Sequence, residues 1–126
     1  MTRTVLLIED EPNIIEAIRF LLTREGWQVE THSNGADAVE TVLKFLPDLL
    51  ILDLMLPGRS GLEILQDLRD HGATRSLPVL MLTARGHSRD REMAERAGVS
   101  RFMTKPFSNH EVLGAIRDLL AETHRP

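Results

Sequence analysis

The stretch LLILDLMLPG, residues 49–58, places one aspartate among hydrocarbon side chains. Four consecutive apolar residues before Asp53 predict a short strand that is buried on both faces, because such a run has no polar face to turn to solvent. An ionised carboxylate that leaves water without a partner costs on the order of several kcal/mol. Asp53 must therefore be paired, or it must lie where the strand reaches the surface.

The composition limits the classes to which the chain can belong. A chain of 126 residues, 42% hydrophobic and 27% charged, is typical of a single globular domain, which we expect over residues 1–126 with no effector domain. A net charge of −4 argues against direct nucleic-acid binding, and the absence of cysteine excludes disulfides and thiolate zinc sites. No apolar run approaches the roughly 20 residues of a membrane helix. We expect a cytoplasmic protein with no membrane association.

The rest of the chain alternates between strand and helix patterns. Continuous apolar runs and β-formers predict five strands, at residues 4–8, 27–31, 47–53, 77–83 and 100–104. Apolar residues at helical spacing follow each strand, and the segment around residues 88–97 has the weakest apolar face. This alternation predicts an α/β fold, a doubly wound parallel sheet with helices on both faces. Ligands of such sheets bind outside the carboxyl ends of the strands.

Polar residues collect where these predicted strands end. The groups that would meet at this edge are three acids after the first strand, one acid after the third, a hydroxyl and a lysine: Glu9, Asp10, Glu11, Asp53, Thr83 and Lys105. Carboxylates this close raise one another's pKa unless positive charge lies among them. One lysine does not balance four acids. A hard divalent cation held by oxygen ligands suits the edge, and Mg²⁺ is the natural candidate.

Each of these residues also has a plain structural interpretation. Asp10 or Glu11 before Pro12 is typical of a helix cap, Thr83 is a common β-former, and a lone lysine is usually a solvated charge. The functional interpretation is favoured because all of them fall at strand ends of one sheet edge. The five histidines, by contrast, have no metal-ligand spacing, and we expect them at the surface (residues 32, 71, 87, 110 and 124).

Four segments together resemble the receiver domain of two-component response regulators. They are VLLIEDEP, PDLLILDLMLPGRSG, LPVLMLTARG and RFMTKPF, and the resemblance covers residues 3 to about 122. It is greatest to the receivers of winged-helix transcription regulators. The resemblance implies a bacterial signalling domain with a flavodoxin-like (βα)5 fold, whose five parallel strands lie in the order 2-1-3-4-5.

The resemblance also implies the chemistry of the edge. Asp53 would be the phosphoacceptor, receiving a phosphoryl group from a sensor histidine kinase or a phosphotransfer protein. Asp10, Asp53 and the backbone carbonyl of Met55 would bind Mg²⁺ directly, and Glu9 would bind it mainly through water. Lys105 would contact the acyl phosphate. Such a domain is a phosphoacceptor in signalling that catalyses only its own phosphorylation and dephosphorylation.

A switch follows from the same resemblance. Thr83 would be the switch hydroxyl and Phe102 the switch aromatic, and together they would change the 83–122 surface that controls an output partner or effector domain. The Lys105–Pro106 peptide would be cis, which costs only about 0.5–1 kcal/mol before proline.

The resemblance is incomplete at the surface through which winged-helix receivers pair. Arg91 and Glu111 match that pattern and are candidates for one pair between two copies. Four positions depart from it: Arg96, Ser100, Arg101 and Ala115. An exposed ion pair contributes only about 0–1 kcal/mol, and the two new arginines would face their copies. We expect a monomer or a weak dimer.

Three other functions are compatible with parts of the sequence. An aspartate-nucleophile phosphohydrolase would need a second acid two residues after Asp53, where this chain has Met55. A flavodoxin-like nucleotide-binding module would need a Gly/Ser/Thr-rich cradle after the first strand, where EDEP stands. A pseudo-receiver that acts only as a protein-interaction scaffold would not need the complete set of acids, Thr83 and Lys105.

Overall fold

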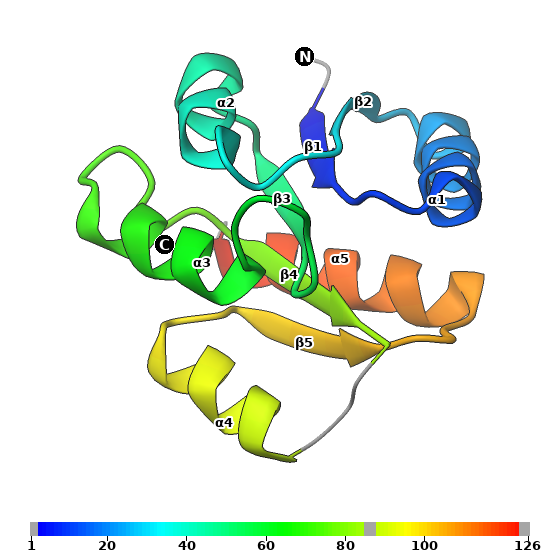
Figure 1. Ribbon diagram of the computed structural model, residues 1–126. Helices are drawn as coiled ribbons and strands as arrows, with labels where there is room; N and C mark the ends of the chain where they lie inside the picture. Colours follow the sequence, from blue (N-terminus) through cyan, green and yellow to red (C-terminus); the bar gives the residue numbers. More distant parts are fainter. Residues whose placement is uncertain (1–2, 85–87, 124–126) are drawn as a thin grey trace.

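The computed structural model describes residues 3–84 and 88–123, in which strands and helices alternate along the chain (Figure 1). The strands are β1 (Thr4–Ile8), β2 (Gln28–His32), β3 (Leu49–Asp53), β4 (Val79–Thr83) and β5 (Arg101–Thr104). The helices are α1 (Pro12–Arg24), α2 (Ala38–Phe45), α3 (Gly61–Asp70), α4 (Ser88–Arg96) and α5 (Asn109–Thr123). Each predicted element is present.

The ends of four strands differ slightly from the prediction. β2 is shifted by one residue toward the C-terminus, and β5 begins one residue later than expected. β3 begins at Leu49 and β4 at Val79, each two residues later than expected. Pro47 and Pro78 precede these strands, and proline has no N–H to donate to the sheet.

The sheet has the predicted topology. Its five strands are all parallel and lie in the order β2-β1-β3-β4-β5. Ile8 pairs with Leu52 across β1 and β3, and Asp53 pairs with Leu82 across β3 and β4. The carboxyl ends of these central strands therefore meet at one edge of the sheet.

Helices cover both faces of the sheet. Figure 1 shows α1 and α5 on one side and α2, α3 and α4 on the other. Alternate residues of each strand enter the two cores, as in Leu7 toward α1 and α5 and Leu6 toward the opposite helices. β3 is buried at all five positions, so its apolar run packs on both faces, as its sequence predicts.

Among the helices of the described residues, α4 has the fewest buried residues. Ala94 is its one fully buried residue, and the large apolar side chain of Met93 is 42% exposed. Few buried apolar contacts make a local segment cheap to displace. The weak apolar pattern around residues 88–97 thus corresponds to a weakly packed helix.

Two backbone hydrogen bonds hold the loop between β3 and α3 against the end of β3. The Leu54 N–H donates to the Leu82 carbonyl at 2.8 Å, and the Gly61 N–H donates to the Leu54 carbonyl at 2.9 Å. This second bond places the first residue of α3 directly against the backbone of Asp53 and Leu54. The start of α3 therefore fixes the end of β3.

Within residues 3–84 and 88–123, no helix combines the length and the apolar character needed to cross a bilayer.

Candidate functional site

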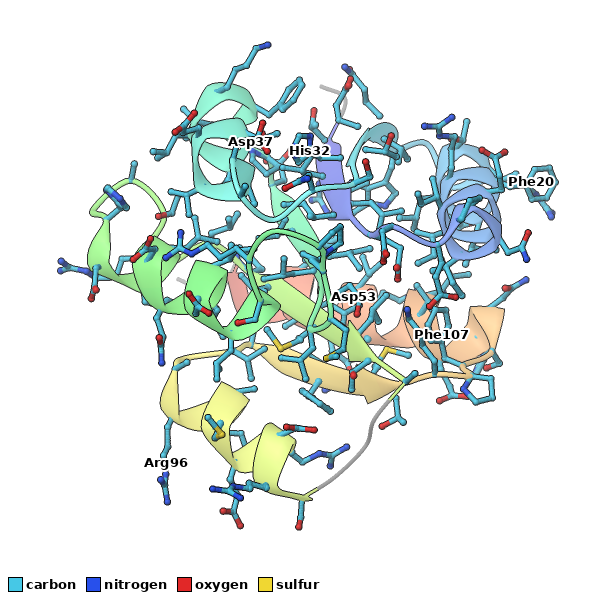
Figure 2. All side chains as sticks on the ribbon, viewed as in Figure 1. Phe20, His32, Asp37, Asp53, Arg96 and Phe107 are labelled. Carbon is cyan, nitrogen blue, oxygen red and sulfur yellow. The ribbon has the colours of Figure 1, made fainter. Side chains whose placement is uncertain are left out.

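Three carboxylates meet at the carboxyl edge of the sheet. Glu9 and Asp10 follow β1, and Asp53 ends β3, beside the loop that follows it (Figure 2). One oxygen from each carboxylate lies within 4.8 Å of the others. Glu9 is fully buried and Asp53 is 3% exposed, whereas Asp10 is open to solvent. The sheet register brings these acids together, because Ile8 of β1 pairs with Leu52 of β3 and the residues that follow them are Glu9 and Asp53.

The buried Glu9 is held by backbone donors. Its Oε2 accepts the N–H groups of Asp10 at 3.0 Å and Glu11 at 3.2 Å. Burial and the neighbouring Asp53 carboxylate raise the pKa of Glu9, while Lys105 and the backbone bond oppose that rise. The raised pKa of Glu9 indicates that Lys105 and the backbone donors do not fully neutralise the carboxylates of the site.

Lys105 is the cation of the site. Its Nζ lies 2.7 Å from Glu9 Oε1, 3.1 Å from Glu11 Oε1 and 3.5 Å from Asp53 Oδ2. Burial alone would lower the pKa of Lys105, but the three carboxylates outweigh burial and raise it. The ammonium is consequently held in its charged form. The Lys105–Pro106 peptide that positions it is cis.

The second oxygen of Asp53 is held by the loop after β3. Asp53 Oδ1 accepts the Met55 N–H at 3.1 Å, while Oδ2 faces Lys105. The Met55 side chain is 51% exposed and takes no part in this contact. Asp53 is thus fixed by a backbone donor on one oxygen and an ammonium on the other.

The donor set suits a hard cation. Oxygens from Glu9, Asp10 and Asp53 are of the type that Mg²⁺ prefers, and two to three negative charges in one cleft supply the attraction. Asp10 is exposed, so the cleft is open to solvent on its side, and a bound Mg²⁺ would keep water ligands there. The residues present therefore fit Mg²⁺.

Comparison with known proteins agrees with this geometry. The family model for the response regulator receiver domain matches residues 5–117. The chain belongs to the response regulator receiver family. Receiver domains act in signalling and bind Mg²⁺ at an acidic pocket.

Curated relatives of this receiver domain are transcriptional regulators. It is 41% identical over 120 residues to the probable transcriptional regulatory protein TcrX of Mycobacterium tuberculosis. It is 38% identical over 120 residues to the phosphate regulon regulator PhoB of Escherichia coli. The alignments cover 95% of this chain and 50% and 52% of those proteins, so the chain spans about half the length of the relatives it matches.

Solved structures of receivers superimpose closely on this one. A putative response regulator from Chloroflexus aurantiacus has a TM-score of 0.90 and 32% identity, covering 96% of this chain and 99% of that one. The receiver domain of a Pseudomonas aeruginosa sensor histidine kinase has a TM-score of 0.87 and 26% identity, with the same coverage. That second structure has a magnesium ion coordinated in its active-site cleft.

The receiver domain places Thr83 and Phe102 on one face of neighbouring strands. Phe102 pairs with Met81, and Thr83 follows Met81 by two residues, so the side chains of Thr83 and Phe102 leave the sheet on the same side. Thr83 is fully buried, and its carbonyl accepts the Lys105 N–H at 2.7 Å. The guanidinium of Arg91 lies over the Phe102 ring, 5.4 Å from its centroid. Helix α4 thus contacts the aromatic residue beside the site.

The candidate interface residues Arg91 and Glu111 have partners within the chain. Glu111 Oε1 accepts the Ser108 N–H and Ser108 Oγ accepts the Glu111 N–H, each at 3.1 Å, which forms a capping box at the start of α5. Arg101 pairs with Asp118 at 2.7 Å, so part of the repulsion expected from this arginine is offset.

Two contacts of the edge were not foreseen from the sequence. Glu11 is the N-cap residue of α1, but its side chain makes no capping hydrogen bond and pairs with Lys105 instead. His32, expected simply at the surface, is half-buried and bonds Asp37 at 2.7 Å (Figure 2), and this bond lowers the pKa of Asp37. Of the other histidines, 71 and 110 are exposed, and 87 and 124 lie outside the described residues.

Proposed function

We propose that this receiver domain accepts a phosphoryl group on Asp53 from a sensor histidine kinase or a phosphotransfer protein, in a Mg²⁺-dependent reaction. The observation that carries the proposal is the environment of Asp53. Its carboxylate is nearly buried among Glu9, Asp10 and Lys105 at the carboxyl edge of the sheet. Membership of the receiver family supports the same role.

The chemistry asked of Asp53 is a nucleophilic displacement at phosphorus. One carboxylate oxygen forms the new P–O bond, the bond from phosphorus to the donor breaks, and the leaving group departs with the electron pair of that bond. Phosphoryl transfer depends mainly on positioning and on neutralising the equatorial oxygens. Lys105 is placed to donate to one of them, and the Met55 N–H keeps Asp53 oriented.

Mg²⁺ would be held directly by Asp10, Asp53 and the Met55 carbonyl, and mainly through water by Glu9. When bound, it supplies the positive charge that the phosphoryl oxygens need on the side away from Lys105. The lysine and the acids have separate tasks in this scheme: Lys105 binds the transferred group, and Glu9 and Asp10 bind the metal.

The test of the proposal is phosphate incorporation from a small acyl phosphate. We expect one phosphoryl group per chain in the presence of Mg²⁺ and none in the presence of a chelator, with mass spectrometry of peptides assigning it to Asp53. Asp10→Ala should weaken the apparent Mg²⁺ affinity of the reaction by about 10- to 100-fold, since it removes a charged ligand. Incorporation without Mg²⁺, or on a hydroxyl or histidine side chain, would refute the assignment.

A second part of the proposal is that Thr83 and Phe102 pass phosphorylation on to the 83–122 surface. Thr83→Ala should accept phosphate at a rate within a few-fold of wild type, because the hydroxyl is not the nucleophile. It should lose most of the phosphorylation-dependent change in backbone chemical shifts across α4 and β5, because no hydroxyl remains to follow the phosphoryl oxygens. Shift changes of the same size in Thr83→Ala and wild type would show that the coupling takes another route.

The output and the partners are part of the same proposal. The domain, over residues 1–126 and cytoplasmic, would act on an effector domain or on a separate protein, without binding nucleic acid or membrane itself. It would be a monomer or a weak dimer. This expectation is supported by Arg91 and Glu111, which already contact Phe102 and Ser108 in their own chain.

The other functions are less well supported. A phosphohydrolase lacks its second acid at Met55, and we propose that the domain catalyses only its own phosphorylation and dephosphorylation. A pseudo-receiver scaffold would have no need for the Lys105 ammonium to lie against Glu9 and Asp53.

A further inference from the structure

Glu11 occupies the N-cap position of α1, but its side chain makes no capping hydrogen bond. It stands at the N-cap of α1, before Pro12, in extended conformation (φ −84°, ψ 115°), where Ser, Thr, Asp and Asn are the residues whose side chains reach the first helical N–H groups. The Glu11 carboxylate makes no such bond. Its Oε1 lies 3.1 Å from Nζ of Lys105, which is 94 residues away in the sequence.

Three carboxylate oxygens surround the Lys105 ammonium, and its Nζ donates hydrogen bonds to Glu11 Oε1 and Asp53 Oδ2. An ammonium has three N–H bonds, and the Lys105 Nζ faces one oxygen each of Glu9, Glu11 and Asp53. A phosphoryl oxygen arriving on Asp53 needs one of these donors. The phosphoryl oxygen therefore has to approach an ammonium that Glu9 and Glu11 already contact.

Burial indicates which of these two carboxylates can yield to the phosphoryl oxygen. The Glu9 side chain is 0% exposed and bound by two backbone N–H groups, so withdrawal from Lys105 would leave a buried charge. Asp53 is the reacting group. The Glu11 side chain is 55% exposed and can turn into water at little cost.

We propose that Glu11 is a specificity-determining residue of the phosphoryl transfer, which positions Lys105 before the reaction and selects against highly charged small phosphoryl donors. This inference rests on the proposed function of Asp53. The Lys105 ammonium must bind the incoming phosphoryl donor. The Glu11 carboxylate, which contacts this ammonium and faces solvent, repels a negatively charged donor. The penalty grows with the negative charge on the donor, so a dianion is disfavoured more than a monoanion.

The variant Glu11→Gln tests the inference. It keeps the length and polarity of the side chain and removes its charge, and Lys105 keeps its contacts with Glu9 and Asp53. With Mg²⁺ saturating, phosphorylation by the dianion acetyl phosphate should accelerate about tenfold over wild type, and by the monoanion phosphoramidate about threefold. Raising the ionic strength from about 0.1 M to about 1 M should shrink both ratios, because the Debye length falls from about 10 Å to about 3 Å.

The matched control is Glu16→Gln. Glu16 lies on the same helix, is 73% exposed and is 3.8 Å from Arg19, so the variant removes one negative charge without touching Lys105. Its rates with both donors should stay at the wild-type values. Equal acceleration of the two donors by Glu11→Gln, or an acceleration no larger than that of Glu16→Gln, would overturn the inference. Wild-type protein that incorporates no phosphate on Asp53 would instead overturn the proposed function.

Discussion

Asp53→Asn is expected to abolish phosphoryl incorporation from any donor while leaving the fold intact. The amide that replaces the carboxylate is not a nucleophile toward phosphorus, so the loss should be complete rather than partial. The remaining carbonyl oxygen can still accept the Met55 N–H, now at 3.1 Å from Asp53 Oδ1. The measurement is phosphate incorporation by intact-protein mass spectrometry, together with the free energy of unfolding from denaturant titration.

The same substitution should also reduce the response to Mg²⁺. It removes one of the three carboxylates whose oxygens lie within 4.8 Å of one another. With less repulsion to relieve, Mg²⁺ should raise the Tm of Asp53→Asn by less than it raises that of wild type.

Asp48→Asn is the control for charge. Asp48 precedes β3 at its opposite end, is exposed, and accepts the Thr4 N–H at 2.8 Å, a bond that an amide oxygen can also accept. This variant should incorporate phosphate and respond to Mg²⁺ as wild type does. If Asp53→Asn still took up one phosphoryl group per chain, another residue would be the acceptor.

The fold and the main site follow from patterns that are local in the sequence. The apolar run before Asp53 predicts a strand buried on both faces, and β3 is buried throughout. The alternation of strands and helices predicts a parallel sheet, and parallel strands have their carboxyl ends at one edge. The acids that follow β1 and the aspartate that ends β3 are therefore expected to lie close together. The register of Ile8 with Leu52 then places Glu9 beside Asp53.

The contacts that the sequence did not predict depend on side-chain reach across the fold. Glu11 before Pro12 is typical of a helix start, and no local pattern indicates that its carboxylate turns toward Lys105. A long side chain at an N-cap position is a usable signal, because glutamate is not among the residues preferred there. In EDEP this signal is hard to separate from the two acids before it, because Asp10 is itself a typical cap residue.

Arg69 shows a second reason why some contacts cannot be predicted from the sequence. Its guanidinium donates to backbone carbonyls of Thr74, Leu77 and Gly98 at 2.8–3.0 Å and so ties the end of α3 to the loops before β4 and β5. Burial lowers the pKa of Arg69. Backbone carbonyls are the same for every residue type, so a cluster of them leaves no trace in the sequence.

A change from glycine to alanine at residue 61 should damage both the fold and the site. Gly61 is the first residue of α3, and an added Cβ would collide with the Asp53 carbonyl and lie 2.9 Å from the Leu54 Cα. These are backbone atoms in a buried strand end, so no flexible side chain can move aside. We expect Gly61→Ala to lower the free energy of unfolding by about 3 kcal/mol, within the usual range for overpacking.

The effect on phosphorylation should be larger than the loss of stability alone would suggest. The atoms that must shift belong to Asp53 and its neighbour, and a displacement of about 1 Å at a reacting group can cost about 100-fold in rate. Phosphate incorporation should therefore be slow even under conditions in which Gly61→Ala is fully folded, as judged by circular dichroism.

Gly114→Ala separates this steric effect from the effect of helix propensity. Gly114 lies inside α5, and apart from the backbone of its own helix, no atom of the described residues lies within 4 Å of an added Cβ there. Alanine in a helix interior is favoured over glycine by about 1 kcal/mol, so Gly114→Ala should be more stable than wild type and should accept phosphate normally. The same chemical change is thus expected to affect stability with opposite signs at the two positions, because at residue 61 the space is filled by the backbone at the end of β3. A Gly61→Ala protein as stable as wild type would show that α3 can move away from β3, and that Asp53 is positioned by Met55 and Lys105 without it.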